Sequence, residues 1–184
     1  MKASQIACKQ LRSVRWSMMP FCESRMQSPT SDRIARSIRE QTGHTIETVT
    51  ADLTSADDVN RVASLIADNA GITMLINNAG VGATAPLLQS DVKAMSAMIA
   101  LNVEALTRLT YATVPGFVER TRGTIVNIAS FVAITPERLN GVYGWSKAFS
   151  QASGRSLKAA MSTCRSSFRL GITFGHQFWA SARH

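Results

Sequence analysis

Glycine is missing from the first 42 residues of this 184-residue chain, where the first glycine is Gly43. Glycine lets the backbone approach a ligand closely, and loops that bind phosphate through their backbone amides depend on it. The N-terminal segment is therefore not expected to contain such a loop. A later Gly80-Val81-Gly82 sequence is too short and too far along the chain to replace it.

Cysteine and histidine are also scarce. The three cysteines, Cys8, Cys22 and Cys164, form no Cys-x-x-Cys pair beside a histidine. An odd number of dispersed cysteines argues against a disulfide framework and against a structural zinc site. The three histidines are His44, His176 and His184, and none has a partner at ligand spacing. No metal is expected.

Long apolar runs are absent as well. No stretch approaches the roughly 18 apolar residues that span a membrane. The N-terminus lacks the apolar segment of a secretory signal. With 45% hydrophobic and 17% charged residues, the composition is typical of one globular domain. We therefore expect a cytoplasmic protein with no membrane partner.

Acidic residues are few at both ends of the chain, although the net charge is +8. Residues 1–40 carry a charge of +5, residues 41–150 a charge of −2 and residues 151–184 a charge of +5. Proteins that bind nucleic acid usually combine clustered basic charge with aromatic or glycine-rich interleaving. Neither terminus has that pattern, so no nucleic-acid partner is expected. A basic module that binds nucleic acid or a membrane surface remains an alternative.

Residues 31–161 alternate between strand and helix patterns. Strands are predicted at residues 45–50, 72–76 and 124–129, and helices at residues 31–43, 54–71, 92–122 and 141–161. The run 72–76 is almost entirely apolar, which is typical of a strand buried on both faces. We expect Pro115-Gly116 to break or kink the third helix. Alternation at these lengths predicts an α/β fold, with a parallel sheet and helices on both faces.

Tyr143 and Lys147 are four residues apart on the last predicted helix, so they share one face of it. A fixed cation beside a phenol stabilises the phenolate, which lets the tyrosine act as a general acid or base near neutral pH. The pair alone is weak evidence, because many helices place an aromatic residue and a lysine at this spacing simply for packing.

Four further motifs stand at defined places in the predicted elements. They are Asn77-Asn78-Ala79-Gly80 after an apolar strand, Asn102 within a long helix, Ser130 at a strand end thirteen residues before Tyr143, and Asp52-Leu53 after an earlier strand. In isolation, Asp52 could be a turn residue, Asn102 a helix-kink residue and Ser130 a strand-end cap. In order and separation, the set resembles the short-chain dehydrogenase/reductase family over residues 31–159.

The resemblance implies a Rossmann-like, doubly wound parallel sheet and an NAD(P)-dependent oxidoreductase. Tyr143 would be the general acid/base, and Lys147 would assist it and hold the nicotinamide ribose. Ser130 would orient the substrate oxygen, and Asn102 would support a water linking Lys147 to solvent. The cofactor, NAD or NADP, would also contact Asp52, Leu53, Asn78, Ala79 and Gly80. The substrate would be a small-molecule alcohol or carbonyl compound, and a homo-oligomer is expected.

Both ends depart from the family pattern. The family begins with a strand and a glycine-rich turn that binds the pyrophosphate, and neither is recognisable before Ser31. After Met161 the family's next strand and Pro-Gly turn are not recognisable either. We therefore divide the chain into an unmatched basic segment at residues 1–30, a partial Rossmann-like domain at residues 31–161 and an unmatched basic tail at residues 162–184. Translation of these ends outside the ancestral reading frame is one hypothesis for the departures.

Two functions follow from this division. The first is an active oxidoreductase that interconverts a secondary alcohol and a carbonyl compound. The second is a degenerate, non-catalytic relative that no longer binds cofactor, because loss of the pyrophosphate loop would remove several hydrogen bonds worth about 1 kcal/mol each. Loss of the first strand would also leave unpaired strand edges at the centre of the sheet.

Overall fold

A computed structural model describes residues 3–8, 28–44, 46–83, 87–134, 141–161 and 167–174. Its strands are β1 (Ala3–Cys8), β2 (Ile46–Ala51), β3 (Met74–Asn77), β4 (Arg122–Ala129) and β5 (Ser167–Phe174). Its α-helices are α1 (Ser28–Thr42), α2 (Ala56–Ala67), α3 (Val92–Ile99), α4 (Leu106–Glu119) and α5 (Gly141–Met161). Short 3-10 helices cover Leu87–Gln89 and Phe131–Ala133, and a π-helical turn covers Ala100–Ala105.

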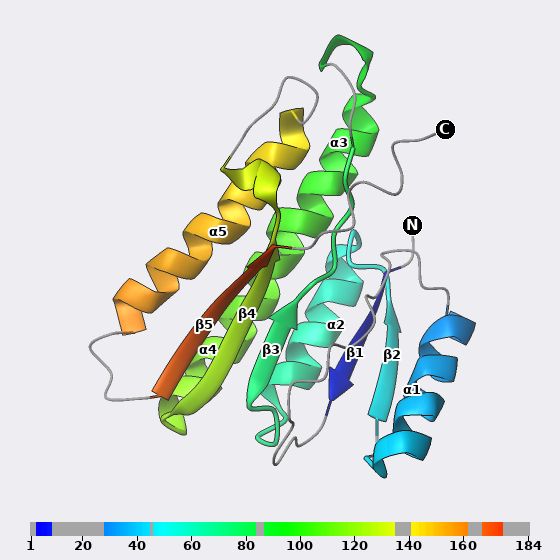
Figure 1. Cartoon of the computed structure of the whole chain (residues 1–184), viewed down its shortest axis with the longest axis vertical. Coiled ribbons are helices and arrows are strands. Elements are labelled where there is room, and N and C mark those ends of the chain that lie inside the picture. The colour runs from blue at the N-terminus through cyan, green and yellow to red at the C-terminus, as the bar shows by residue number, and fades with distance from the viewer. Residues whose placement is uncertain are drawn as a thin grey trace.

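The strands form two sheets (Figure 1). Strands β3, β4 and β5 make a parallel sheet in that order, with Met74 paired to Thr124 and Arg122 paired to Ser167. Strands β1 and β2 make a separate antiparallel pair, in which Ala3 faces Ala51. β1 lies between β2 and β3 in Figure 1 but is hydrogen-bonded only to β2 among the strands described. A strand therefore occupies the place where the sequence predicted none, although among the described strands it is paired on one side only.

The helices pack on the strands as an α/β fold requires. α2 packs along α4, while α4 and α5 both pack against β4, and α1 packs against β2 (Figure 1). One buried cluster joins the end of β2 to α2 and the π-helical turn through Leu53, Val59 and Leu101. A second cluster joins Leu75, Phe117 and Ile125 between the parallel sheet and α4. The predicted α/β class is confirmed.

Most elements fall where the sequence places them, and their ends have local causes. α1 ends at Gly43, whose φ of 71° permits the left-handed conformation and whose N–H donates to the Arg39 carbonyl at 2.8 Å. α3 begins after Asp91, whose carboxylate accepts hydrogen bonds from the backbone of Lys93 and Ala94. α5 has the predicted bounds.

Three expectations about the elements are wrong. Strands β1 and β5 lie in the terminal segments, where no strand was predicted. β3 is not buried on both faces, because Met74 and Ile76 are 40% and 48% exposed. Pro115 does not break its helix, since α4 continues to Glu119. The helical region is interrupted earlier, at the π-helical turn that contains Asn102.

Candidate active site

Tyr143 and Lys147 lie in the first two turns of α5, on one buried face. Tyr143 is 9% exposed and Lys147 is 7% exposed. The Lys147 ammonium lies 6.0 Å from the centroid of the Tyr143 ring and donates a hydrogen bond to the Ile128 carbonyl at 3.0 Å. Burial lowers the pKa of Lys147 to about 8. A lysine in this environment is still mainly protonated at neutral pH, so the phenol has a cation beside it.

Asn102 is positioned by the π-helical turn and is almost completely buried. Its Oδ1 accepts a hydrogen bond from Val81 N at 3.0 Å, and its Nδ2 donates to the Val81 carbonyl at 2.9 Å. The same Nδ2 donates to Ser146 Oγ at 3.0 Å. π-helical turns often occur at functional sites because the extra residue redirects a side chain. Here that side chain connects the segment after β3 to α5.

Gly80 brings the backbone after β3 against the Asn102 amide and the Lys147 ammonium. A Cβ atom at this position would lie 3.0 Å from Asn102 Oδ1 and 3.3 Å from Lys147 Nζ. These are tight contacts, so only glycine fits without displacing a neighbour. Asn78 and Ala79 precede it as partly buried residues between the strand and this contact. The structure therefore brings together four of the predicted site residues from three elements: Gly80, Asn102, Tyr143 and Lys147.

Ser130 directly follows β4 and is 7% exposed. It has an extended backbone, and its carbonyl accepts a hydrogen bond from Ala133 N, which begins the short helix Phe131–Ala133. That helix packs against α5, and its Val132 belongs to the same buried cluster as Tyr143 and Met98. Ser130 therefore lies at the strand end beside the start of α5. Residues 135–140 of the following loop lie outside the described residues.

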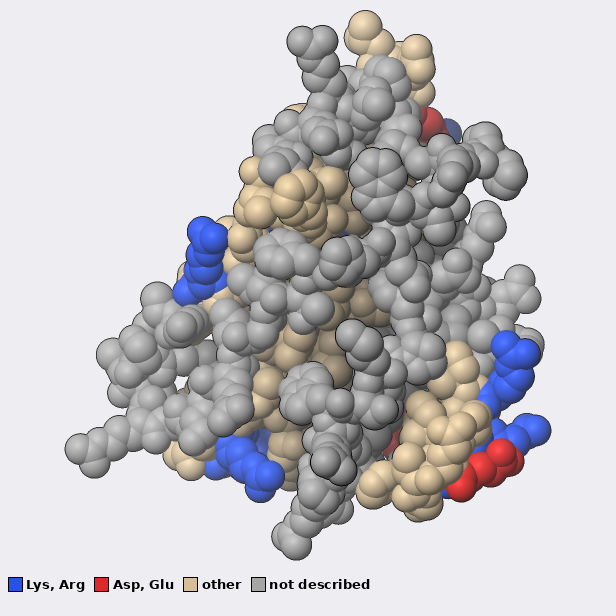
Figure 2. All heavy atoms as spheres, viewed as in Figure 1, with Lys and Arg blue, Asp and Glu red and all other residues tan. Residues whose placement is uncertain are grey.

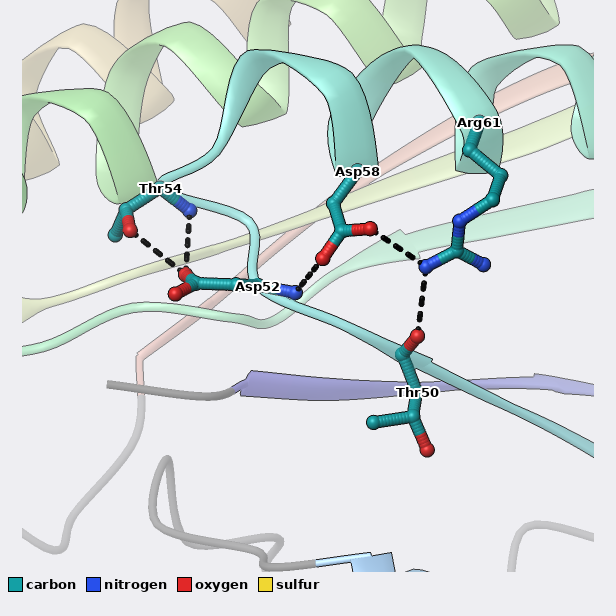
Figure 3. A network of polar contacts seen from close by, with 5 residues as sticks. All are labelled: Thr50, Asp52, Thr54, Asp58 and Arg61. Carbon is teal, nitrogen blue, oxygen red and sulfur yellow. Dashed lines mark hydrogen bonds and ion pairs between the residues drawn. The ribbon is translucent and has the colours of Figure 1, made fainter.

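Asp52 lies in the turn between β2 and α2 (Figure 3), and Leu53 follows it. Leu53 belongs to the buried cluster against which Ala79 packs. Asp52 Oδ1 accepts hydrogen bonds from Thr54 N at 3.0 Å and from Thr54 Oγ1 at 2.7 Å. The Thr54 hydroxyl is the main cause of a lowered pKa for Asp52. The Leu53 side chain is buried in the core beside Val59, so only its backbone is available to a ligand.

The sequence reasoning missed a buried polar network beside this site. Asn77 Nδ2 donates to Asn127 Oδ1 at 2.9 Å and to Thr110 Oγ1 at 3.1 Å. Asn127 Nδ2 in turn reaches the Ser150 carbonyl and Ser153 Oγ, each at 3.3 Å. The sequence did contain a signal for this network: one asparagine lies in each of two neighbouring strands, at positions that face the interior. Asn77 in β3 and Asn127 in β4 are direct partners in the sheet.

Ser146 is a second residue that was missed. It is 2% exposed, accepts from Asn102 Nδ2 and donates to the Tyr143 carbonyl at 2.8 Å. Its place directly before Lys147 was visible in the sequence, but nothing in the spacing pointed to Asn102 as its partner. Ser146 therefore links Asn102 in the π-helical turn to Tyr143 in α5.

The described residues contain no cluster of three or more His, Cys, Asp or Glu side chains that could hold a metal ion. Within the same ranges, no helix is both long and apolar enough to cross a membrane.

The family model for short chain dehydrogenases matches residues 21–165 of the chain. The chain belongs to the short-chain dehydrogenase family.

Its relatives include a very-long-chain 3-oxoacyl-CoA reductase of Anas platyrhynchos, 31% identical over 70% of this chain and 42% of the relative. An NADP-dependent 3-hydroxy acid dehydrogenase of Salmonella typhi is 34% identical over 62% of this chain and 47% of the relative. The chain thus spans about half the length of these curated relatives.

Solved structures agree on the fold. A short-chain dehydrogenase from Sphingobium yanoikuyae in complex with NADPH has a TM-score of 0.70 and is 34% identical, over 77% of this chain and 57% of that one. A bulky-bulky ketone specific alcohol dehydrogenase from Comamonas testosteroni has a TM-score of 0.72 and is 32% identical, over 78% of this chain and 59% of that one. The Rossmann-like fold predicted from the sequence motifs is confirmed.

Proposed function

We propose that this chain is an NAD(P)-dependent oxidoreductase that interconverts a secondary alcohol and a carbonyl compound, with Tyr143 as the general acid/base. The observation that carries the proposal is the placement of the Lys147 ammonium beside the buried Tyr143 ring, 6.0 Å from its centroid. This geometry sets a fixed cation next to the group that would exchange a proton with the substrate oxygen.

The other site residues divide the remaining tasks. Ser130, at the strand end beside the start of α5, would donate a hydrogen bond to the substrate oxygen and fix its orientation. Lys147 would hold the ribose of the nicotinamide. Asn102 would fix the segment after β3 and support a water leading from Lys147 to solvent.

The residues around Gly80 fit a nicotinamide cofactor. Gly80 leaves no room for a Cβ atom between Asn102 and Lys147, so the backbone at this position packs directly against two residues of the proposed site. Asn78 and Ala79 would contribute further backbone contacts, and Asp52 and Leu53 would receive the adenine end. When bound, NAD(P) supplies or accepts the hydride. The NADPH-bound relative and the NADP-dependent relative support this cofactor class.

The substrate class follows from chemistry that the relatives share. Their names specify 3-oxoacyl thioesters, 3-hydroxy acids and bulky ketones. Each of these contains a ketone or a secondary alcohol, which is the pair of groups that Tyr143 and Ser130 can serve. We therefore assign this chain a small-molecule ketone or secondary alcohol as substrate.

The test uses the two tyrosines of the chain. Tyr143→Phe removes the proposed acid/base but keeps the ring, and we expect kcat for NADPH-dependent ketone reduction to fall by about 100-fold or more, with NADPH affinity almost unchanged. Tyr111→Phe is the matched control, because Tyr111 is 75% exposed on α4 and should leave kcat unchanged. Equal activity of wild type and Tyr143→Phe would eliminate the proposed role.

A degenerate relative without cofactor binding is the second candidate. It is favoured by the interruption of the sheet between β1 and β3 and by the lack of glycine before Gly43. Saturable binding of NADPH at or below millimolar concentration distinguishes the first candidate from the second. The basic-module alternative rests on the two basic termini, most of which lie outside the described residues. Among the described residues, the Lys and Arg side chains on the face shown in Figure 2 are dispersed.

A further inference from the structure

The large apolar side chains of α5 lie on its exposed face. Trp145 and Phe149 are 64% and 38% exposed, although α5 packs along β4 and β5 (Figure 1). Beyond Lys147, the buried residues of α5 are Ser150 and Gly154 among those whose side chains are described. Small side chains form shallow ridges, so apolar packing alone fixes the rotation of such a helix weakly. Hydrogen bonds must therefore contribute to holding α5 against the sheet.

Asn127 supplies such hydrogen bonds from the neighbouring strand β4. Its side chain is completely buried, and its Nδ2 donates to the Ser150 carbonyl and to Ser153 Oγ, each at 3.3 Å. Ser153 Oγ donates in turn to the Ser150 carbonyl at 3.0 Å. One amide of the sheet thus meets a carbonyl and a hydroxyl of the helix. Because a buried donor without a partner costs free energy, these contacts oppose a shift of α5.

The next residue of the same strand receives the Lys147 ammonium. Lys147 Nζ donates to the Ile128 carbonyl at 3.0 Å. α5 is therefore tied to β4 at Lys147 and, further along the helix, at Ser150 and Ser153. Since the two ties run to consecutive residues of one strand, a rotation of the helix that broke the second would also move the ammonium relative to the Ile128 carbonyl.

Asn127 is itself held in one orientation. Its Oδ1 accepts a hydrogen bond from Asn77 Nδ2 at 2.9 Å, which leaves its own Nδ2 directed toward α5. Asn77 Nδ2 also donates to Thr110 Oγ1 at 3.1 Å. Thr110 lies on α4, where its hydroxyl contacts Asn77 rather than α5. The buried network therefore has one branch that reaches the helix of the site and one that does not.

We propose that Asn127 is a positioning residue for the Tyr143–Lys147 pair. Its amide sets the rotation of α5 against β4, so that the ammonium stays at the Ile128 carbonyl beside the Tyr143 ring. Asn127 is completely buried and acts through α5, not by contacting substrate or cofactor. The inference rests on the proposed function, because it takes the pair as the acid/base device. Displacement of a reacting group by about 1 Å can cost on the order of 100-fold in rate.

The first measurement is the pKa of Lys147, which burial lowers to about 8. The chain has five lysines, so NMR of carbon-13-labelled lysine can follow this one, with Lys147→Met to assign its signal. Asn127→Leu removes the amide at similar volume, and Ser153→Ala removes one of its acceptors with less risk to folding. When α5 shifts and water reaches the ammonium, the pKa should rise, by about 1 pH unit in Asn127→Leu and by less in Ser153→Ala. Tyr143, the titratable side chain beside the ammonium, is present in every variant.

Thr110→Val is the matched control. Valine keeps the shape of threonine, and loss of the hydroxyl removes a partner of Asn77 from the same buried network. This variant should be less stable than wild type, yet the pKa of Lys147 should keep its wild-type value. In NADPH-dependent ketone reduction, kcat should fall about tenfold in Asn127→Leu with KM within twofold. The kcat of folded Thr110→Val should equal that of wild type.

The pKa measurement separates this inference from the proposed function, because it needs no turnover. If wild type has no oxidoreductase activity but the pKa rises in Asn127→Leu and Ser153→Ala and not in Thr110→Val, the proposed function fails and the positioning role is supported. An unchanged pKa in both α5-contact variants, or an equal rise in Thr110→Val, would overturn the inference. If Asn127→Leu does not fold, Ser153→Ala decides between these results.

Discussion

The Asn102 side chain pairs with the backbone of Val81 in both directions, accepting from its N–H at 3.0 Å and donating to its carbonyl at 2.9 Å. This double contact joins a π-helical turn to the segment that follows β3. It fixes the backbone next to Gly80, where the cofactor site is proposed. The geometry of the site therefore depends on a residue that is distant in the sequence.

Asn102→Ala should loosen this segment. Removing the amide leaves the Val81 N–H and carbonyl without partners, and we expect the free energy of unfolding to fall by about 1–3 kcal/mol. Hydrogen exchange at the Val81 amide should accelerate more than at β4 amides. Asn60→Ala is the control, because Asn60 is an exposed residue of α2 whose amide oxygen accepts a hydrogen bond from Arg108. Unchanged exchange at Val81 in Asn102→Ala would contradict the account.

Gly80→Ala should weaken cofactor binding. The added Cβ would lie 3.0 Å from Asn102 Oδ1, which cannot move away without losing its bond to Val81. We expect the Kd of NADPH to rise at least tenfold and stability to fall by about 1–3 kcal/mol. In Gly141→Ala, a Cβ would meet nothing within 4 Å, so titration should give the wild-type Kd. Equal Kd values for wild type and Gly80→Ala would show that the backbone there does not approach the ligand.

Lys147 should make stability depend on pH. Its pKa is lowered from 10.5 to about 8, so the unfolded chain binds more protons than the folded one between these values. The free energy of unfolding should therefore rise with pH across this window, by up to about 3 kcal/mol at 1.36 kcal/mol per unit. Urea titrations of wild type and Lys147→Met at pH 7.5 and pH 10.5 measure this rise. The difference in stability between the two proteins isolates the contribution of Lys147, because the contributions of the other titratable groups cancel. A difference that does not change with pH would refute this prediction.

The contributions of Asn77 and Asn127 to stability should be strongly coupled. Asn127 is completely buried, and its loss would leave Asn77 Nδ2 with only Thr110 as partner. We expect Asn127→Ala to cost about 2–4 kcal/mol of stability, from a lost hydrogen bond and a cavity. Substitution of both asparagines by leucine should cost less than the sum of the single leucine changes. Additive losses in urea denaturation would exclude the coupling.

The sequence predicts the central elements well because their signals are local. Capping residues, glycine at a helix end and apolar periodicity all act within a few residues, and α2, β4 and α5 lie close to where they were expected. The separation of Tyr143 from Lys147 predicts their contact for the same reason. Helical geometry alone brings positions i and i+4 together.

The missed features depend on contacts between distant segments. β1 forms by pairing with β2, and its own residues have no alternating pattern. β5 pairs with β4 and does alternate, with apolar residues at every second position from Phe168 to Phe174, so this local signal was overlooked. Exposure of Met74 and Ile76 in β3 depends on whether another element covers that face, which a five-residue apolar run cannot indicate. Ser146 was missed because its partner, Asn102, is 44 residues away.

The placement of Asp52 shows an intermediate case. The sequence located it correctly at the end of a strand, before a helix that begins with acidic residues. The pairing of Asp58 with Arg61 on one turn of that helix was also visible as an i, i+3 spacing. That Asp58 turns back to the Asp52 amide depends on the path of the turn, which the sequence does not specify.

The central claim is that the chain retains a working cofactor site around Lys147 despite its departures from the family pattern. Fluorescence titration of the full chain with NADPH tests this most directly, with Lys147→Met as the comparison. We predict saturable binding by wild type at or below millimolar concentration, and a Kd at least tenfold higher for Lys147→Met. No saturable response from folded wild-type protein at millimolar NADPH would contradict the claim.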